Sequence, residues 1–405
     1  MSTQVHASID ETTVRQLSEE LGEPEWLLET RLDALDALET LDFPDVIQTP
    51  GRLWTDLADL DYDSLVDPLN AAEEKDQVGP DNAEVLSFAE AVDEHEDLLK
   101  EHFGSVVDPQ TNYLTALSTA LFSTGTVVYV PEKVDAEDVK VRTTMNSRSL
   151  FNYTLVVAEE SSSVTLLERQ ETGENVEGDR YYSGLVEVSA GENAYVQYGS
   201  LQNLDQTTYN YQLKEGVADT YGQVDFIDCN AGSRLSKSSV ETHLEGDSSE
   251  TKIVGAFYGH EDQHFDIDAR VWHRNENTTA DLVTRGVIDD LARSVYEGVQ
   301  DVGRDAWNTS SYQRENTLML SDESEADASP KLIINNHDTE ASHSATVGQV
   351  DDEDMFYMAS RAVPERTAKN MLVKGFYVPV LEEIEVDELR EDFQALVRER
   401  LEARD

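Results

Sequence analysis

Residues 330–361, PKLIINNHDTEASHSATVGQVDDEDMFYMASR, contain the transition from strands to helices. Apolar and polar residues alternate in the first part, as in a strand, and the spacing becomes helical from Asp351. Between them lies the run 342–348, which is small and polar around one histidine, His343. Asp351 and Asp352 are candidate caps for the helix that follows. We therefore expect a body of strands that ends here, a short turn around His343, and a helical tail.

Short strands separated by polar turns fill the chain before this joint. Clusters such as residues 171–174 and 245–248 are typical of turns. No fixed repeat is recognisable, so the pattern alone leaves a sandwich, a barrel and a β-helix open. The predicted strands cover residues 126–130, 149–157, 164–168, 185–188, 194–198, 209–213, 223–228, 238–244, 252–258, 265–271 and 278–287.

Helical spacing flanks the strand region on both sides. Asp108 is the candidate cap of the last helix before the strands, and Gly375 is expected to end the helix that Pro364 opens. Residues 40–80 lack a steady period and predict an extended linker with short local structure. The predicted helices cover residues 10–22, 24–38, 83–103, 108–123, 351–360, 364–375 and 386–401. The expected organisation is an N-terminal helical region with an acidic linker (1–110), a strand-rich core domain (111–346) and a C-terminal helical domain (347–405).

Acidic residues dominate the composition. The 405 residues include 84 Asp and Glu against 30 Lys and Arg, a formal charge of −54. Self-repulsion of this size destabilises a fold at low salt, whereas molar salt screens it over about 3 Å. We interpret the surplus as the solvated surface of a halophilic protein. It argues against direct nucleic-acid binding, because few cations are available to meet phosphates.

Cysteine content and hydropathy limit the compartment and the chemistry. The chain has one cysteine, Cys229, so it cannot form an internal disulfide or a site with several thiolates. No apolar run approaches the roughly 20 residues of a membrane span, and no signal sequence opens the chain. We expect a cytoplasmic protein, and we interpret Cys229, which follows a predicted strand, as a buried small hydrophobe.

Three histidines, His260, His264 and His273, gather in one segment of the strand region. Positions four apart on a strand lie roughly 13 Å apart, too far for one metal ion. Convergence of the three from neighbouring rungs of a β-helix would still allow a metal. We favour structural or interface histidines over a metal site.

The string ASHSATVGQVDDEDMFYMASRAVP, residues 341–364, resembles the C-terminal signature of the SufB/SufD family of iron–sulfur assembly proteins. Residues 112–134, 314–332 and 369–381 also resemble family text, whereas the first hundred residues do so weakly. The resemblance implies a right-handed parallel β-helix core. SufB-type scaffolds carry a ligating cysteine in the strand that here holds residues 314–317, and a glutamate where this chain has Ser344. The chain is therefore more similar to SufD, the supporting partner.

The resemblance also implies a role for each candidate residue. His343 would hold a nascent iron–sulfur cluster at an interface with a SufB-like subunit, and the chain alone would keep no cluster stably bound. No phosphate-binding loop is present, so energy would come from the SufC-like ATPase of the family. That ATPase would dock on the C-terminal helices, with Asp352, Met355, Phe356, Tyr357 and Arg361 as the candidate contacts.

Two alternatives stay open beside this SufD-like subunit, which would not itself be an enzyme. The nearer one is a SufB-like scaffold that acts as a homodimer and holds the cluster alone. The other, from a different class, is a β-helix carbohydrate-active enzyme with acids along one groove. With 84 acids, no particular carboxylate pair points to such chemistry.

Overall fold

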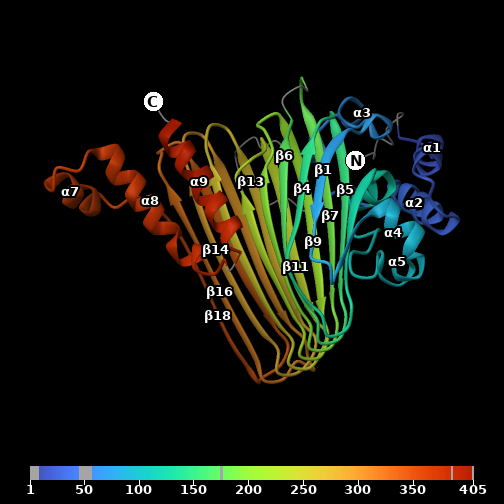
Figure 1. The fold of residues 1–405 in the computed structure, drawn as a ribbon. Coiled ribbons are helices and arrows are strands. Elements are labelled where there is room, and N and C mark those ends of the chain that lie inside the picture. The colour runs from blue at the N-terminus through green and yellow to red at the C-terminus, as the bar shows by residue number, and fades with distance from the viewer. Residues whose placement is uncertain (1–8, 45–56, 174–176, 385, 404–405) are drawn as a thin grey trace.

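A computed structural model describes residues 9–44, 57–173, 177–384 and 386–403. In this part of the chain the strands form two nine-stranded sheets that face each other (Figure 1). Sheet A holds, in order, β1 (Glu73–Val78), β4 (Asp135–Met145), β6 (Ser163–Thr172), β8 (Tyr195–Asn203), β10 (Gln223–Asn230), β12 (Glu250–Gly259), β14 (Thr279–Ile288), β16 (Thr309–Met319) and β18 (Thr339–Gln349). Sheet B holds, in order, β2 (Glu84–Ser87), β3 (Thr124–Val130), β5 (Ser149–Ala158), β7 (Arg180–Ala190), β9 (Thr208–Ala218), β11 (Leu235–Leu244), β13 (His264–His273), β15 (Arg293–Val302) and β17 (Glu325–Ile334).

From β3 onward the chain alternates between the two sheets at every strand, and each pair of strands makes one rung of a parallel β-solenoid. Neighbours within a sheet pair in parallel, except that β1 pairs antiparallel with β4 and β2 with β3. The predicted β-helix core with helical regions at both ends is confirmed. The boundaries proposed at residues 110 and 346 stay predictions.

The corners that lead into sheet A use the left-handed backbone conformation. Asn193, Tyr221, Ser248, Asn277 and Asn308 have φ between 55° and 60°, and each lies one or two residues before a strand of that sheet. Asn adopts this conformation more readily than most residues because its short side chain bonds locally. Here the amides also bond between rungs, since Asn308 donates to Asn277 at 2.7 Å. The left-handed corner positions therefore form a column of residues other than glycine.

Helices cover the N-terminal end and the outer face of sheet B. Every residue of β5 is buried, which requires cover on both faces, because successive side chains point to opposite sides. The inner cover is sheet A. The outer cover is an apolar cluster formed with α1 (Glu11–Leu21), α2 (Glu25–Ala37), α4 (Phe88–Glu94), α5 (Glu96–His102) and α6 (Tyr113–Leu121). Shorter helices, η1 (Leu57–Asp59), α3 (Tyr62–Leu65) and η2 (Pro68–Asn70), connect this region to β1.

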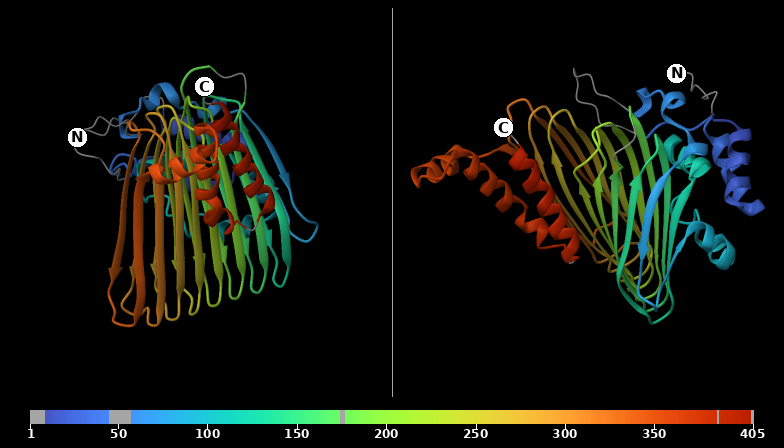
Figure 2. Two further views of the ribbon diagram at one scale, coloured as in Figure 1. Left: turned by 90° about the vertical axis from the view of Figure 1, so that its left-hand side faces the viewer. Right: turned by 45° about the horizontal axis from the view of Figure 1, so that its top comes forward.

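In the described residues, three helices form the C-terminal region, and the last two cover the outer face of sheet A. They are α7 (Asp352–Ser360), α8 (Glu365–Leu381) and α9 (Asp387–Ala403). Side chains of α8 and α9, such as Tyr377 and Phe393, pack with outward residues of the sheet, such as Ile227 and Val254. In contrast, α7 extends past the last rung and away from the sheets (Figures 1 and 2). No helix in the described ranges has the length and apolar character needed to cross a bilayer.

Several predicted helix caps are confirmed. Asp10 accepts a hydrogen bond from the backbone of Thr13, Gly22 follows α1 with a φ of 69°, and Asp351 caps α7. The predicted cap at Asp108 is wrong, because α6 begins later and its N-cap is Asn112.

Two predicted helices have different bounds. The region 83–103 is not one helix: Glu84–Ser87 forms β2, and Ser87 then starts α4 through a reciprocal cap with Glu90. Gly375 does not end α8, which continues to Leu381 because Tyr377, Val380 and Leu381 are buried against sheet A. Residues 45–56 of the predicted linker lie outside the described residues, and its last part forms β1.

Arg31 is a fully buried cation that joins α2 to the start of the solenoid. Its guanidinium pairs with Glu23 at 2.5 Å, donates to the carbonyls of Ala120 and Phe122 at 3.1 and 2.8 Å, and lies 3.7 Å from the centre of the Phe122 ring. Replacement would leave the buried Glu23 carboxylate without its cation. Such losses cost about 3–5 kcal/mol.

We predict that Arg31→Met lowers the free energy of unfolding by about 3–5 kcal/mol in urea titrations at fixed salt. The matched control is Arg15→Met on α1, which removes an exposed pair with Glu11. It should cost less than about 0.5 kcal/mol. Equal effects of the two substitutions would show that the buried pair does not join these elements.

Candidate functional site

The two ends of the solenoid differ. At the first end, short antiparallel strands and helices cover the rungs. At the other end, β17 and β18 are the last strands of their sheets, and among the described residues no strand pairs with their outer edges. Most of β18 is exposed, in contrast to the buried inner rungs. An open edge of this length presents a row of free backbone N–H and C=O groups, a ready template for a partner strand.

His343 lies in the middle of β18, at this open end. The predicted turn around it is wrong, because residues 339–349 form one continuous strand paired with β16. His343 pairs with Gln313, which is buried and faces the interior of the solenoid. Directly paired residues of a parallel sheet point to the same face, so the imidazole continues an interior column. It is nevertheless exposed, because no rung follows it within the described residues.

Glu315 is a carboxylate that sequence reasoning did not select. It lies on β16, is 1% exposed, and pairs with Ala345, two residues from His343. Thr317 donates a hydrogen bond to one carboxyl oxygen, and the other oxygen has no partner among the described residues. Burial raises the pKa of Glu315 to about 7. The last two rungs thus bring an imidazole and a carboxyl to the same face of sheet A.

The predicted docking residues on α7 fall into two groups. Asp352, Met355 and Phe356 line a groove of about 410 Å³ between α7 and the end of the last rungs. Tyr357 and Arg361 contact each other, with the guanidinium 5.3 Å from the ring centre. Phe356 is 76% exposed, so it does not pack inward. The helix thus presents aromatic surface to solvent.

The structure does not bring His260, His264 and His273 together to share a metal ion. His264 and His273 are the first and last residues of the ten-residue strand β13, roughly 30 Å apart. Burial lowers the pKa of His264 to about 3 and that of His273 to about 4, so both are neutral at pH 7. His260 lies in the preceding turn, 3.3 Å from the Gln206 amide. No group of three metal-binding side chains occurs in the described ranges.

Cys229 is buried on the outer side of sheet A, in the apolar cluster under α8 and α9. Burial raises the pKa of its thiol, so it is uncharged at neutral pH. The interpretation as a small hydrophobe agrees with this position. In the described part of the chain, the open end therefore has no thiolate of its own.

Comparisons with known proteins identify relatives along most of the chain. The model of the SUF system FeS cluster assembly, SufBD core domain, matches residues 141–376, and that of the SufBD protein N-terminal region matches residues 59–140. The iron-sulfur cluster assembly protein SufD of Bacillus subtilis is 28% identical over 97% of this chain and 98% of its own length. SufBD family proteins of Staphylococcus saprophyticus and Staphylococcus haemolyticus are 27% identical, over 94% of this chain and 90% of their own.

The raised pKa of Glu315 predicts a pH dependence of stability. Between pH 4.5 and about 7 the folded protein binds the Glu315 proton and the unfolded chain does not. The free energy of unfolding therefore falls as pH rises through this window. Glu315→Gln should remove the contribution of Glu315 to this pH dependence and make the protein up to about 3 kcal/mol more stable at pH 8, with little change at pH 4.5.

Urea titrations at pH 4.5 and pH 8 measure this difference. Glu340→Gln, at an exposed position of β18, is the matched control and should change stability by less than about 0.5 kcal/mol at either pH. If Glu315→Gln and the wild-type protein have parallel pH profiles, the Glu315 carboxyl is not buried as described.

Proposed function

The chain belongs to the SufBD family of iron–sulfur cluster assembly proteins, and from this premise we propose that it is a SufD-like subunit, not itself an enzyme. In this proposal it pairs with a SufB-like subunit through β17 and β18, and we call this interface the seam. It docks a SufC-like ATPase on α7 and contributes His343 to a nascent cluster at the seam. The observation that carries the proposal is the position of His343, exposed in the middle of an unpaired edge strand.

The partner strand would add a rung across the seam. The edge of β18 supplies its free N–H and C=O groups, and Ile333, Ile334 and Val347 supply exposed apolar surface beside them. A partner that covers these groups satisfies the backbone and removes the apolar surface from water in one step. His343 would then become an interior residue of a continuous solenoid, shielded from bulk water.

The nascent cluster is the cargo of this seam and binds only transiently. A neutral imidazole nitrogen is a suitable ligand for iron and binds it more weakly than a thiolate does. The only cysteine of the chain is buried elsewhere, so thiolate ligands must come from the SufB-like subunit. Glu315 lies on the same face, and one of its oxygens has no partner in the part of the chain that the structure describes, so it would accept a proton or a hydrogen bond near the seam.

The ATPase would act through the C-terminal helices. Because α8 and α9 pack on the outer face of sheet A, a force applied at α7 is transmitted to the strands. Ion pairs add to this attachment, Arg169 with Glu388 at 2.7 Å and Lys252 with Glu383 at 2.7 Å. ATP binding would open the seam only if the closed, ATP-bound pair of ATPase subunits binds more tightly to the open arrangement of the two SufB/SufD-type subunits than to the closed one.

The surface charge bears on other partners. A formal charge of −54 opposes contact with nucleic acid or anionic membranes, and we propose a cytoplasmic complex in a halophile. A SufB-like homodimer is the second candidate, since an unpaired edge can also pair with a second copy of itself. Anaerobic reconstitution distinguishes the two, because only the homodimeric scaffold would keep a cluster without a partner.

We predict that His343→Ala leaves folding and complex formation intact and lowers the cluster yield about tenfold or more. Even outer-shell partners of metal ligands are worth about 10–100-fold in metal affinity, so loss of a ligand should cost at least this. The measurement is iron and sulfide content of the anaerobically purified complex. His337→Ala, in the exposed turn before β18, is the control. Wild-type yield from His343→Ala would remove the proposed role.

Phe356→Asp should weaken binding of the SufC-like ATPase by at least about 30-fold while the SufB-like subunit still binds, because a buried aromatic anchor is worth about 2 kcal/mol or more. Titration calorimetry with each partner measures both affinities. Tyr221→Asp, at an exposed corner of the solenoid, makes the same change elsewhere. Unchanged affinity for the ATPase would show that it docks on another face.

A further inference from the structure

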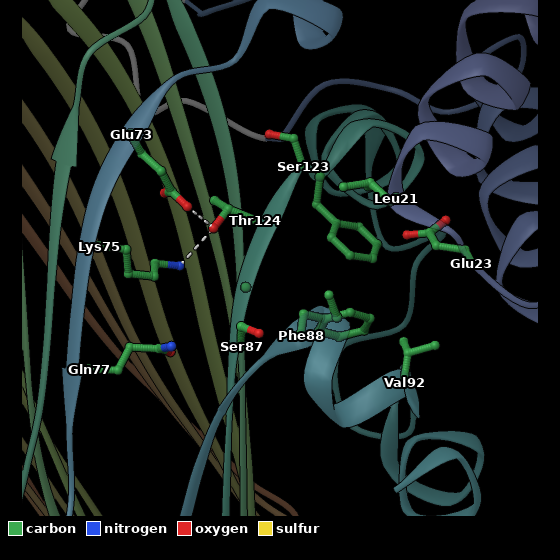
Figure 3. Close-up of a pocket in the computed structure, with 13 residues that line it drawn as sticks. Leu21, Glu23, Glu73, Lys75, Gln77, Ser87, Phe88, Val92, Ser123 and Thr124 are labelled. Carbon is green, nitrogen blue, oxygen red and sulfur yellow. Dashed lines mark hydrogen bonds between the residues drawn. The ribbon is translucent and has the colours of Figure 1, made fainter. Parts of the chain in front are cut away.

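A cavity of about 240 Å³ lies beside β1, at the first end of the solenoid (Figure 3). The open edges of β17 and β18 are at the opposite end of the strand order. Its walls are β1, the residues that lead from α6 into β3, and parts of α1 and α4. One water molecule occupies roughly 30 Å³ in the liquid, so the space exceeds a single water several-fold. Neither cluster transfer nor ATPase docking, as proposed above, uses it.

One wall of the cavity is polar. Glu73, Lys75 and Gln77 alternate along β1 with exposed residues, and their side chains point into the space (Figure 3). The Lys75 ammonium donates to Thr124 at 3.0 Å and to Asn152 at 2.7 Å. Among the described residues these are two hydrogen bonds for three N–H groups. The ammonium therefore has one donor left for a ligand.

Three buried side-chain oxygens around the cavity have no hydrogen-bond partner in the described part of the chain. Glu73 accepts a hydrogen bond from Thr124 through one carboxyl oxygen. Its other oxygen and the side-chain oxygens of Gln77 and Ser123 have none among the described residues, although all three are buried. Buried polar atoms in folded proteins are nearly always paired, so such a group of atoms signals a missing partner. Two of the three can act only as acceptors, which calls for a donor on the ligand.

The opposite wall is apolar. Phe88 and Phe122 lie edge to face, with ring centroids 5.0 Å apart, and Leu21 and Val92 complete the surface. Aromatic rings bind well to such a surface in stacked or edge-to-face contact. Apolar lining with a few convergent polar groups is the usual construction of a small-molecule site.

We propose that this cavity binds a small aromatic primary amide. The amide N–H groups would donate to Glu73 and Gln77, the amide carbonyl would accept from Lys75, and the ring would contact Phe88 and Phe122. An anionic head group is opposed by the Glu73 carboxylate, and a cationic one by the Lys75 ammonium. The carboxamide matches both because it donates and accepts at once.

Three probes share one ring and differ in the head group: benzamide, benzylamine and benzoate. We expect saturable binding of benzamide to the full chain by ligand-observed NMR, at least tenfold tighter than binding of benzylamine or benzoate. Ala89→Leu should weaken benzamide binding at least tenfold, because Ala89 is an exposed residue that lines the cavity and a larger side chain obstructs it. Circular dichroism and the unfolding midpoint verify that this variant folds.

Two substitutions of one strand complete the test. Glu73→Gln removes the buried charge and should weaken benzamide binding at least tenfold. Glu74→Gln makes the same change on the exposed side of β1 and should leave it unchanged. Absence of saturable benzamide binding, equal binding by the wild-type protein and Ala89→Leu, or a preference for benzoate would each overturn the proposal. None of these outcomes depends on cluster yield, so they leave the proposed assembly function untouched.

Discussion

A parallel solenoid cannot satisfy the backbone hydrogen bonds of its own last rung. Every inner strand pairs on both sides, but the final strand of each sheet has one open edge. This chain resolves the problem differently at its two ends. At the first end, β1 and β2 pair antiparallel with β4 and β3, and Leu86 of β2 packs against the cluster of the N-terminal helices. At the last end the edges of β17 and β18 stay open, and there His343 lies at the mouth of the interior.

Scarcity of cations shapes the rest of the molecule. The chain has 30 Lys and Arg against 84 acids, and several of these cations join separate parts of the fold. Buried Lys214 pairs with Asp228, and buried Lys237 pairs with Asp266. Arg31 joins α2 to the solenoid. Arg169 and Lys252 attach α9 and the end of α8 to sheet A. Molar salt weakens the exposed pairs, but the apolar cluster beneath these helices does not depend on charge.

The sequence made parts of this architecture predictable and obscured others. The caps at Asp10 and Asp351 and the exposed Phe356 followed from local chemistry and from the family signature. The solenoid repeat was hidden because rungs differ in length: the offset between paired residues is 27 from Gln223 to Glu250 and 31 from Thr279 to Ser310.

Other features depend on contacts that no local pattern records. The edge strand β2 has helical spacing in sequence, yet pairing with β3 makes it a strand. Glu315 was indistinguishable among 84 acids, and only the register of β16 shows that it faces the interior. The alternation of Glu315 with Gln313 and Thr317 along the strand was the one signal available.

The central claim is that the open edge of the last rung is the surface this chain shares with a sister subunit. Amide hydrogen–deuterium exchange of the chain alone and in complex with its SufB-like partner tests it most directly. The account predicts that the amides of β17 and β18 that point to the open edge, away from β15 and β16, exchange fast in the isolated chain and become protected in the complex. Amides of β1 and β2 should not change. Protection confined to the N-terminal helices, or none at β18, would contradict it.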